Sequence, residues 1–166
     1  MKGKHGLLLA FLLLTGTAFW MRPEDLGASG KIEVDDPYEA EGAWECPVRP
    51  GTEEWIDLGS TAERRAACQP PRETLEAMDT AALLETALDY PFCSDMLCFD
   101  REEDGYQVQL QHNSALAALA DRSDRHEVLR ARLEGMDAWM DEVGRTCSAR
   151  SSERHHYLTI FERCMD

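Results

Sequence analysis

The chain has 166 residues and carries 32 acidic and 17 basic side chains, giving a formal net charge of −15 with neutral histidines. Such a large negative charge repels phosphate backbones and anionic lipid headgroups. It therefore argues against nucleic-acid binding and against membrane-surface binding through bulk electrostatics. It favours solubility instead, and the length suits a single domain.

The first eighteen residues have the pattern of an export signal. Lys2 and Lys4 precede the apolar run LLLAFLLLTGTAFW, which at about 14 residues is shorter than the roughly 20 that a transmembrane helix needs. Small residues stand at −3 and −1 of a possible cleavage site after Ala18. We expect a signal peptide over residues 1–18 and an exported chain that is secreted, periplasmic or at the cell surface. An uncleaved anchor is the alternative, and it would be the chain's only tie to a membrane.

Residues 19–57 are predicted to form an acidic, flexible segment. This stretch combines glycine, proline and acidic residues with few apolar ones, and it lacks a helical period. Such a composition is typical of a disordered, solvated tether. Its carboxylates would bind a cation only within a closed cage, and a run of charges ordinarily faces water. The carboxylates in question are Asp35, Asp36, Glu39 and Glu41.

Residues 58–166 are predicted to form an all-α domain. Ser60 and Glu63 form a capping-box pattern at the start of one helix, and Asp79 or Thr80 caps another. In the stretch SDRHEVLRARLEGMDAWMDEVG, apolar residues recur at steps of three and four. We expect a compact array of about six short helices, arranged as a bundle or in a helical-repeat-like stack.

The cysteines indicate disulfide bonds. An even number of cysteines in an exported chain favours disulfides over metal ligands, and there is no CxxC pair for a zinc or redox site. Sequence alone cannot choose among the roughly 15 pairings that six cysteines allow. The six candidates are Cys46, Cys68, Cys93, Cys98, Cys147 and Cys164.

The spacing of the cysteines nonetheless suggests preferred pairs. Cys147 and Cys164 bracket the last predicted helix and could tie its ends. Cys46 is expected to fix the acidic segment to the domain, with Cys68 as one candidate partner. The remaining two cysteines are five residues apart and would pair only if the chain turns between them. In a continuous helix their separation of about 7.5 Å exceeds the usual Cα distance across a disulfide.

The stretch DREEDGYQVQLQ begins like a calcium-binding loop. Asp100, Glu102 and Asp104 occupy positions one, three and five, and Gly105 occupies position six. Position twelve is the neutral Gln111, where a calcium loop places a bidentate glutamate. We therefore interpret the acids as the start of a helix, where each is favoured by about 0.3–1 kcal/mol. The glycine is then a turn or a close-packing point, and a calcium site is the less favoured alternative.

No other motif defines a catalytic, metal or cofactor site. Carboxylates are too abundant for any pair to stand out, and the sequence has neither a GxSxG nor an HExxH pattern. His155 and His156 are adjacent, so on a helix they diverge and cannot chelate one ion together. Trp44 and Trp55 could grip a glycan or a peptide, although packing against the helical core is favoured.

Two stretches carry a resemblance to a known family. They read ERxxACQxP over Glu63–Pro70 and LxxMxTxxLLExxLxYP over Leu75–Pro91, followed by Gly105 and Asn113. The chain resembles a family of uncharacterised, mostly exported bacterial proteins with this pattern. The resemblance implies a compact helical domain of unknown function and supplies no catalytic residues. It also favours the helix-start interpretation, since members lack the acidic run before the matching glycine, and the cysteines beyond Cys68 suggest additional disulfides in this chain.

Three functions are consistent with these observations. The leading hypothesis is an exported, non-catalytic helical domain that binds another protein or the cell envelope, an analogy from fold to function. A hydrolase with a carboxylate-based site is the first alternative, and two carboxylates with perturbed pKa values in a deep pocket would promote it. A calcium-binding module is the second alternative.

Overall fold

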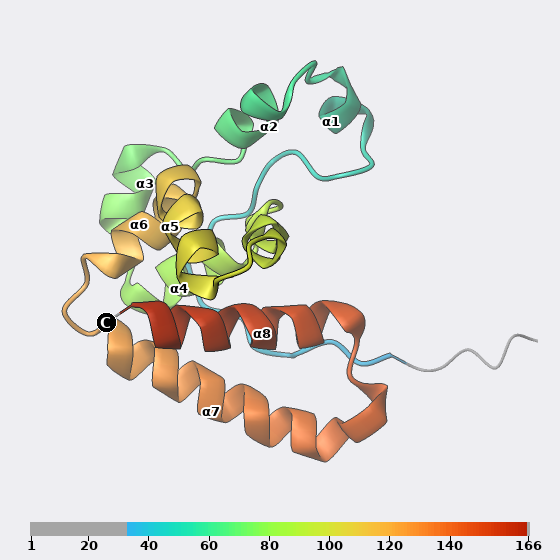
Figure 1. Ribbon diagram of the computed structural model, residues 1–166, viewed down its shortest axis with the longest axis vertical. Coiled ribbons are helices and arrows are strands. Elements are labelled where there is room, and N and C mark those ends of the chain that lie inside the picture. Colours follow the sequence, from blue (N-terminus) through green and yellow to red (C-terminus); the bar gives the residue numbers. More distant parts are fainter. Residues whose placement is uncertain (1–32, 166) are drawn as a thin grey trace, which may run out of the picture. The chain divides into compact units, whose positions relative to one another are not determined.

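The computed structural model describes residues 33–165. The predicted signal peptide and the first part of the predicted flexible segment lie outside the described residues. Within the described part, the chain forms eight α-helices and two short 3-10 helices, and the only β-type pairing is an isolated parallel bridge between Val34 and Cys147. The prediction of an all-α fold is therefore confirmed (Figure 1).

The helices are mostly short and follow one another closely along the chain. Their bounds are α1 Glu53–Asp57, α2 Thr61–Ala67, α3 Arg72–Ala77, α4 Thr80–Leu88, η2 Cys93–Cys98, α5 Glu102–His112, α6 Ser114–Ala120, α7 Arg125–Val143, η3 Gly144–Thr146 and α8 Ala149–Cys164.

Side-chain caps define several of these boundaries. The Ser60 hydroxyl accepts a hydrogen bond from the Glu63 backbone N–H (3.2 Å), and the Glu63 carboxylate accepts one from the Ser60 N–H (2.9 Å), so the predicted capping box is present. Asp79, rather than Thr80, caps α4 by accepting from the backbone of Ala82 at 2.7 Å.

Asn113 lies where α5 ends and α6 begins. Its side-chain oxygen accepts from the backbone N–H of Leu116 (3.1 Å) and so caps α6. Its amide nitrogen donates to the backbone oxygen of Ala87 in α4 (3.0 Å). One buried amide thus ends α5, starts α6 and ties both helices to α4.

Helix α4 lies at the centre of the domain. Eight of its nine residues are buried, and it packs against α6, α7 and α8. Helices α7 and α8 lie side by side and are connected through η3, where Gly144 has a positive φ of 54° (Figure 1). A residue without a Cβ adopts that backbone conformation at little cost.

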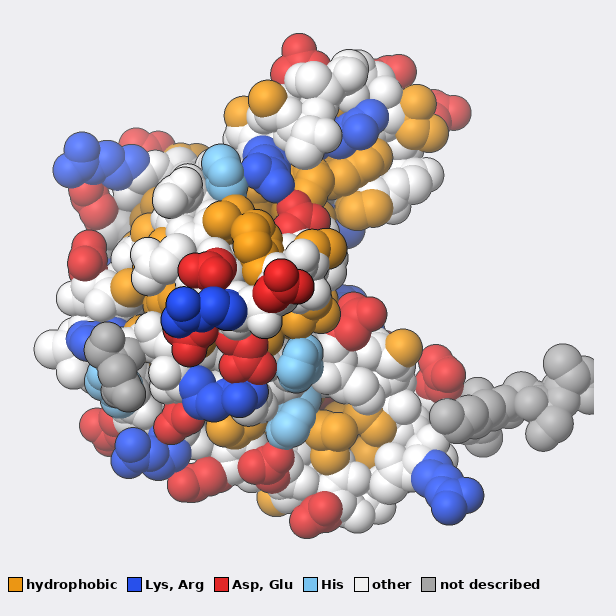
Figure 2. Space-filling model, in the orientation of Figure 1, with side chains coloured by type: hydrophobic (Ala, Val, Ile, Leu, Met, Phe, Trp, Pro, Cys, Tyr) orange, Lys and Arg blue, Asp and Glu red, His pale blue; other side chains and the backbone are white. Residues whose placement is uncertain are grey.

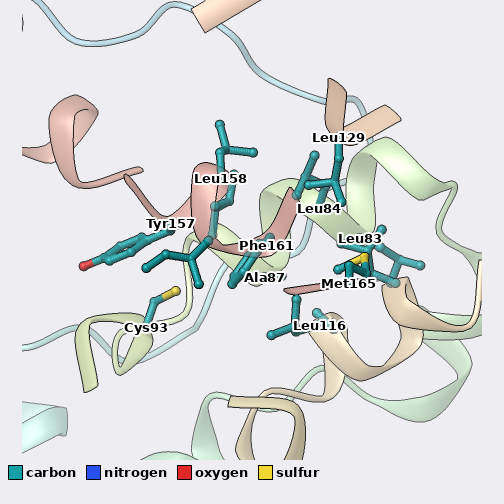
Figure 3. Close-up of a cluster of buried hydrophobic side chains, with 14 of the residues drawn as sticks. Leu83, Leu84, Ala87, Cys93, Leu116, Leu129, Tyr157, Leu158, Phe161 and Met165 are labelled. Carbon is teal, nitrogen blue, oxygen red and sulfur yellow. The ribbon is translucent and has the colours of Figure 1, made fainter. Parts of the chain in front are cut away.

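The main apolar core is built from the inward faces of these helices. Leu83, Leu84, Leu116, Leu129 and Phe161 have at most 1% of their surface exposed. Figure 3 shows α4, α6, α7 and α8 each contributing to this cluster, with Phe161 beside Ala87. Burying a large apolar side chain contributes about 1.5–3 kcal/mol, so these positions dominate the favourable free energy of folding.

A second, smaller apolar cluster surrounds the disulfide between Cys46 and Cys68. The two Cα atoms are 4.9 Å apart, and Tyr90 is buried beside the bridge. Trp55 from α1 stacks on Phe92 with ring centroids 5.4 Å apart. The predicted pairing of Cys46 with Cys68 is confirmed, and the bridge holds the chain before α1 against the end of α2.

The other four cysteines are free within the described residues, so the prediction of disulfides is wrong for them. Cys147 and Cys164 stand at opposite ends of α8, and at about 1.5 Å per residue the helix holds them more than ~20 Å apart. Cys93 and Cys98 begin and end η2, and the first is buried whereas the second is exposed. The 3-10 helix keeps the chain from turning back between them.

The predicted flexible segment is wrong for residues 33–57, which pack against the helices. We call residues 33–45 the strap. Val34 N–H donates to Thr146 O (2.7 Å), and the Val34 oxygen accepts from the N–H of Ser148 (3.0 Å). Farther along, Trp44 N–H donates to the Thr86 hydroxyl (2.9 Å), and the Trp44 ring packs on both apolar clusters. The partners lie far away in sequence, which is why local composition suggested a free tether.

Candidate functional site

Eight charged side chains form a continuous ion-pair network between the strap and the helices. We call it the arginine–acid network. It joins the strap, the segment before α1, and helices α4, α7 and α8. Its members are Asp36, Glu45, Arg49, Glu85, Asp89, Arg132, Arg150 and Arg154.

Arg132 of α7 is the most buried cation of the network, with 4% of its side chain exposed. Its Nε donates to Glu85 Oε1 (2.8 Å), and its Nη2 donates to the carboxylate of Asp36. The guanidinium carbon lies 4.2 Å from the ring centroid of Tyr38. Burial alone would lower the pKa of Arg132, but the two carboxylates outweigh it and raise that pKa above its ordinary value.

Glu85 links α7 to α8 through the middle of the domain. It projects from α4 with 6% of its side chain exposed, and its second oxygen accepts from Arg154 of α8. Arg154 also approaches Asp89 at 3.8 Å. A buried carboxylate is tolerated where arginines supply matching charge and hydrogen bonds, as they do here on both of its oxygens.

Asp89 gathers three arginines at the C-terminal end of α4. Arg150 Nη2 donates to its Oδ1 at 2.6 Å, Arg49 Nη2 lies 3.1 Å from its Oδ2, and Arg154 completes the set. Cations at this end of a helix also interact favourably with the helix dipole. Burial would lower the pKa of Arg49, but attraction to Asp89 and hydrogen bonds to Asp89 and Glu45 raise it overall.

A cavity of about 410 Å³ lies against this network. Its walls are the strap, the end of α4 and the first turns of α8, and Trp44 and Tyr38 give it an apolar surface beside the charges. A smaller hollow of about 200 Å³ adjoins it and shares Arg49, Asp89 and two arginines of α8. In Figure 1 the strap passes behind α8.

The carboxylates of the network lie beside arginines. The carboxylates of Asp36, Glu85 and Asp89 each face at least one guanidinium group. A general acid or base needs an oxygen within hydrogen-bond reach of the substrate. Here arginines lie beside those oxygens, although the buried Asp89 Oδ2, 3.1 Å from Arg49, lacks a well-formed hydrogen bond among the described residues. The arginines at the cavity mouth retain unused N–H groups. The arrangement can therefore orient a polar ligand.

The predicted calcium candidates do not surround a common point. Asp100 is exposed and precedes α5, whereas Glu102 and Asp104 lie in the first turn of that helix. The Glu102 carboxylate pairs with Arg163 of α8 at 3.2 Å. Among residues 33–165, no three histidine, cysteine or acidic side chains are grouped to hold a metal ion.

The interpretation of this stretch as a helix start is confirmed. Gly105 is buried where α5 meets η2, and a Cβ placed on it would come 2.3 Å from the backbone oxygen of Met96. That separation is far below a van der Waals contact, so the glycine is a close-packing point between two backbones.

The aromatic and histidine candidates have structural partners. Trp44 and Trp55 are half-buried in the apolar clusters, as favoured by the sequence, and Arg64 lies over the Trp55 ring. His155 contacts Asp137 of α7 at 2.7 Å, whereas His156 is exposed. The two tryptophans pack in the apolar clusters and His155 connects α8 to α7, so these residues are not grouped in a separate site.

Sequence reasoning did not find the arginine–acid network, although a signal was present. Leu129, Arg132 and Met136 recur at steps of three and four and lie on the buried face of α7. Glu85 stands inside the otherwise apolar run of α4. A charged residue on the apolar face of a helix requires a buried partner of opposite charge. Arg132 and Glu85 are such partners.

Figure 2 shows one face of the described residues, on which acidic and basic side chains alternate with apolar ones and a hollow separates the side of α1 and α2 from the side of α7 and α8. None of the described helices combines the length and apolar character required to cross a bilayer. No protein-family model, curated protein or solved structure matches the chain.

Proposed function

We propose that the chain is an exported, non-catalytic helical domain that binds another protein or a component of the cell envelope. The observation that carries the proposal is the cavity of about 410 Å³ against the arginine–acid network. Its volume lies at the lower end of the roughly 300–1,000 Å³ typical of ligand sites. Its walls come from the strap, the end of α4 and the start of α8, which are joined to one another by hydrogen bonds.

The charged side chains of the cavity support binding over hydrolysis. Asp36 and Glu85 are the most buried carboxylates there, and both are paired with Arg132. Asp89 is surrounded by three arginines. A carboxylate-based hydrolase needs one group free to take or give a proton near the substrate. The arginines at the cavity mouth offer cationic hydrogen-bond donors to a ligand, beside the exposed carboxylates of Asp35, Glu39 and Glu45.

Two features support export. The N-terminal sequence has the pattern of a signal peptide, and the Cys46–Cys68 disulfide is of the kind that persists in oxidising compartments. The resemblance to exported helical proteins of unknown function agrees with this proposal. It adds no activity that would favour an enzyme.

A binding assay with matched variants tests the proposal. The chain is purified from its exported fraction, labelled, and incubated with washed envelope and with solubilised envelope proteins. The test variant R49A/R150A removes two cavity arginines whose side chains are 41% and 61% exposed, so the fold should be retained. The control R72A/R145A removes two exposed arginines elsewhere.

We expect saturable binding by the wild type and by the control, and binding at least about tenfold weaker for the test variant, as for loss of one charge-assisted hydrogen bond. Saturable binding of equal affinity in all three proteins would show that the binding site does not include the two cavity arginines. Absence of saturable binding by the wild type would contradict the proposed function itself.

A further inference from the structure

A separate cavity of about 420 Å³ lies between α2 and the junction of α5 with α6. It shares no lining residue with the cavity against the arginine–acid network. Among the described residues that line it there is no carboxylate, whereas six line the other cavity. Its polar wall consists of Arg65, Gln69, Gln111, His112 and Ser114. We call it the α2–α5–α6 cavity.

Gln69 holds the two sides of this cavity together. Its side-chain nitrogen donates to the backbone oxygens of Arg65 in α2 and of His112 at the end of α5, each at 2.9 Å. Its side-chain oxygen accepts from the backbone N–H of Ser114 at the start of α6 (2.9 Å). Both amide protons are therefore used within the fold. Gln69 shapes the wall, and contacts with an occupant fall to the other polar residues.

Two polar atoms of the wall, Arg65 Nε and Ser114 Oγ, are buried and have no hydrogen-bond partner among the described residues. Other contacts fix the Arg65 guanidinium, since its Nη2 donates to Asp95 at 2.7 Å and its central carbon lies 5.3 Å from the ring centroid of Phe92. Buried polar groups are ordinarily satisfied by protein, by ordered water or by a ligand. The adjacent cavity is where such a partner can enter.

The remaining polar side chains of the wall are open to solvent. Gln111 and His112 are exposed, and neither side chain forms a hydrogen bond within the described residues. An amide, an imidazole and a hydroxyl group each both donate and accept hydrogen bonds. The charge of Arg65 is matched by Asp95, which does not line the cavity. The wall therefore combines donors and acceptors without a surplus of charge.

A sugar residue fits this chemistry. Its hydroxyl groups also both donate and accept, and its C–H faces suit the apolar part of the wall, which comes from Ala66, Leu110 and Ala117. A neutral ligand avoids the repulsion that a chain of net charge −15 exerts on an anion. A peptide would bring apolar or charged side chains, for which this wall of small apolar residues and neutral polar groups is a poorer match.

We propose that the α2–α5–α6 cavity binds a sugar residue, with Arg65, Gln111 and Ser114 forming hydrogen bonds to its hydroxyl groups. The sugar is either free or part of an envelope glycan, and the experiment below separates these two sources. The inference goes beyond the proposed function and does not depend on it, because the two cavities are lined by different residues.

Nuclear magnetic resonance on the ¹⁵N-labelled, oxidised chain tests this inference. The sugar probes are D-mannose, D-galactose, N-acetyl-D-glucosamine, and the soluble glycans released by hydrolysis from washed envelope. Sodium sulfate and the neutral peptide N-acetyl-trialanine amide are the contrasting probes. The readouts are the Arg65 Nε–H signal and the side-chain amide signals of Gln111. Gln107 is the internal control, since it is an exposed glutamine of the same helix that does not line the cavity.

Two variants, Q111A and S114A, are compared with the matched control Q107A. The Ser114 hydroxyl has no partner in the free chain, so S114A should leave its stability unchanged or slightly raised. The same substitution removes a hydrogen bond to a bound sugar. A purely structural role of Ser114 would give the reverse, with lower stability and unchanged binding.

We expect at least one sugar probe to shift the cavity signals saturably, with binding about fivefold weaker in Q111A and in S114A and unchanged in Q107A. A response to the free sugars as strong as that to the glycans would identify free sugar as the ligand, and a response to the glycans alone would identify the envelope. No saturable response to any sugar probe would overturn the inference. An equal response to sulfate or to the peptide would overturn it too, as would unchanged affinity in both variants.

The variant R49A/R150A separates this inference from the proposed function. It should keep the full response to sugar, because neither arginine lines the α2–α5–α6 cavity. A failure of the sugar probes would leave the envelope-binding result of R49A/R150A untouched, so the two proposals fail independently.

Discussion

The apolar core and the arginine–acid network are both buried, yet they are built in different ways. The core around Leu84 and Phe161 is formed by helices whose own apolar patterns predict which face turns inward. The network depends on pairs far apart in sequence, such as Asp36 with Arg132 and Glu85 with Arg154. The core therefore stabilises the helices, whereas the network fixes the strap on them and shapes the cavity.

The largest expected effect is in the network. Replacing Arg132 with alanine leaves Asp36 buried without its cation and Glu85 paired with Arg154 alone, and removing one partner of a buried pair typically costs about 3–5 kcal/mol. Chemical denaturation of the wild type and R132A measures this loss. The control R130A changes an exposed arginine two residues away and should stay within about 0.5 kcal/mol of the wild type. A similarly small change in R132A would mean that the network is not closed in solution.

Truncating a side chain of the apolar core should lower the free energy of unfolding by a comparable or slightly smaller amount. Leu116 of α6 is fully buried where α6 packs on α4. The variant L116A loses apolar contacts and leaves a cavity, which should lower the free energy of unfolding by about 2–5 kcal/mol. The same denaturation experiment measures it, with L97A as control because Leu97 is 44% exposed. Equal stabilities of L116A and L97A would contradict the described core.

A smaller effect is expected where α5 meets η2. The added methyl group in G105A would collide with the Met96 backbone, and overpacking of this kind costs about 1–3 kcal/mol. Gly135 in α7 is the matched control, since a Cβ there meets no atom within 4 Å. G135A should stabilise the chain by about 0.4–1 kcal/mol, and stabilisation by both substitutions would show that the contact is looser than described.

A loss of stability is also expected at alkaline pH. Burial raises the pKa of Tyr106 and of Tyr157 to about 12, from an ordinary value of 10.0. Burial also raises the pKa of the Cys93 thiol. These groups stay protonated in the folded chain while they ionise in the unfolded chain, so stability is complete below pH 9 and falls as the pH rises toward 12. Unfolding followed from pH 8 to 11 should show this decline, and Y106F should reduce it. A flat profile would contradict the burial of these groups.

The helices could be predicted from sequence because their signals are local. The Ser60 capping box, the Asp79 cap and the spacing of Leu129 and Met136 all act within one or two turns. The structural role of Gly105 followed from the mismatch of its neighbours with a calcium loop. Asn113 was harder to interpret, since its partner Ala87 lies 26 residues away.

The candidate site could not be predicted because nearly all of its bonds are long-range. Asp36 and Arg132 are 96 residues apart, and the Asp36 backbone bonds to Ser151 across 115 residues. Composition of the strap alone suggests disorder, because it does not reveal the hydrogen-bond partners that lie in α4, α7, η3 and α8. The prediction that Cys147 and Cys164 form a disulfide was wrong. It rested on the even number of cysteines, whereas α8 holds these two residues at its opposite ends.

The measurement that tests the central claim most directly is amide hydrogen exchange along the strap. The N–H groups of Val34, Asp36 and Trp44 donate to Thr146, Ser151 and Thr86 at 2.7, 2.9 and 2.9 Å. If the strap is fixed on the helices and forms the cavity wall, these three amides exchange slowly in the wild type, and Asp36 loses its protection in R132A while the core helices keep theirs. Exchange of all three at the rate of an unstructured peptide would show that residues 33–45 form a free tether, and the binding site proposed on them would be lost.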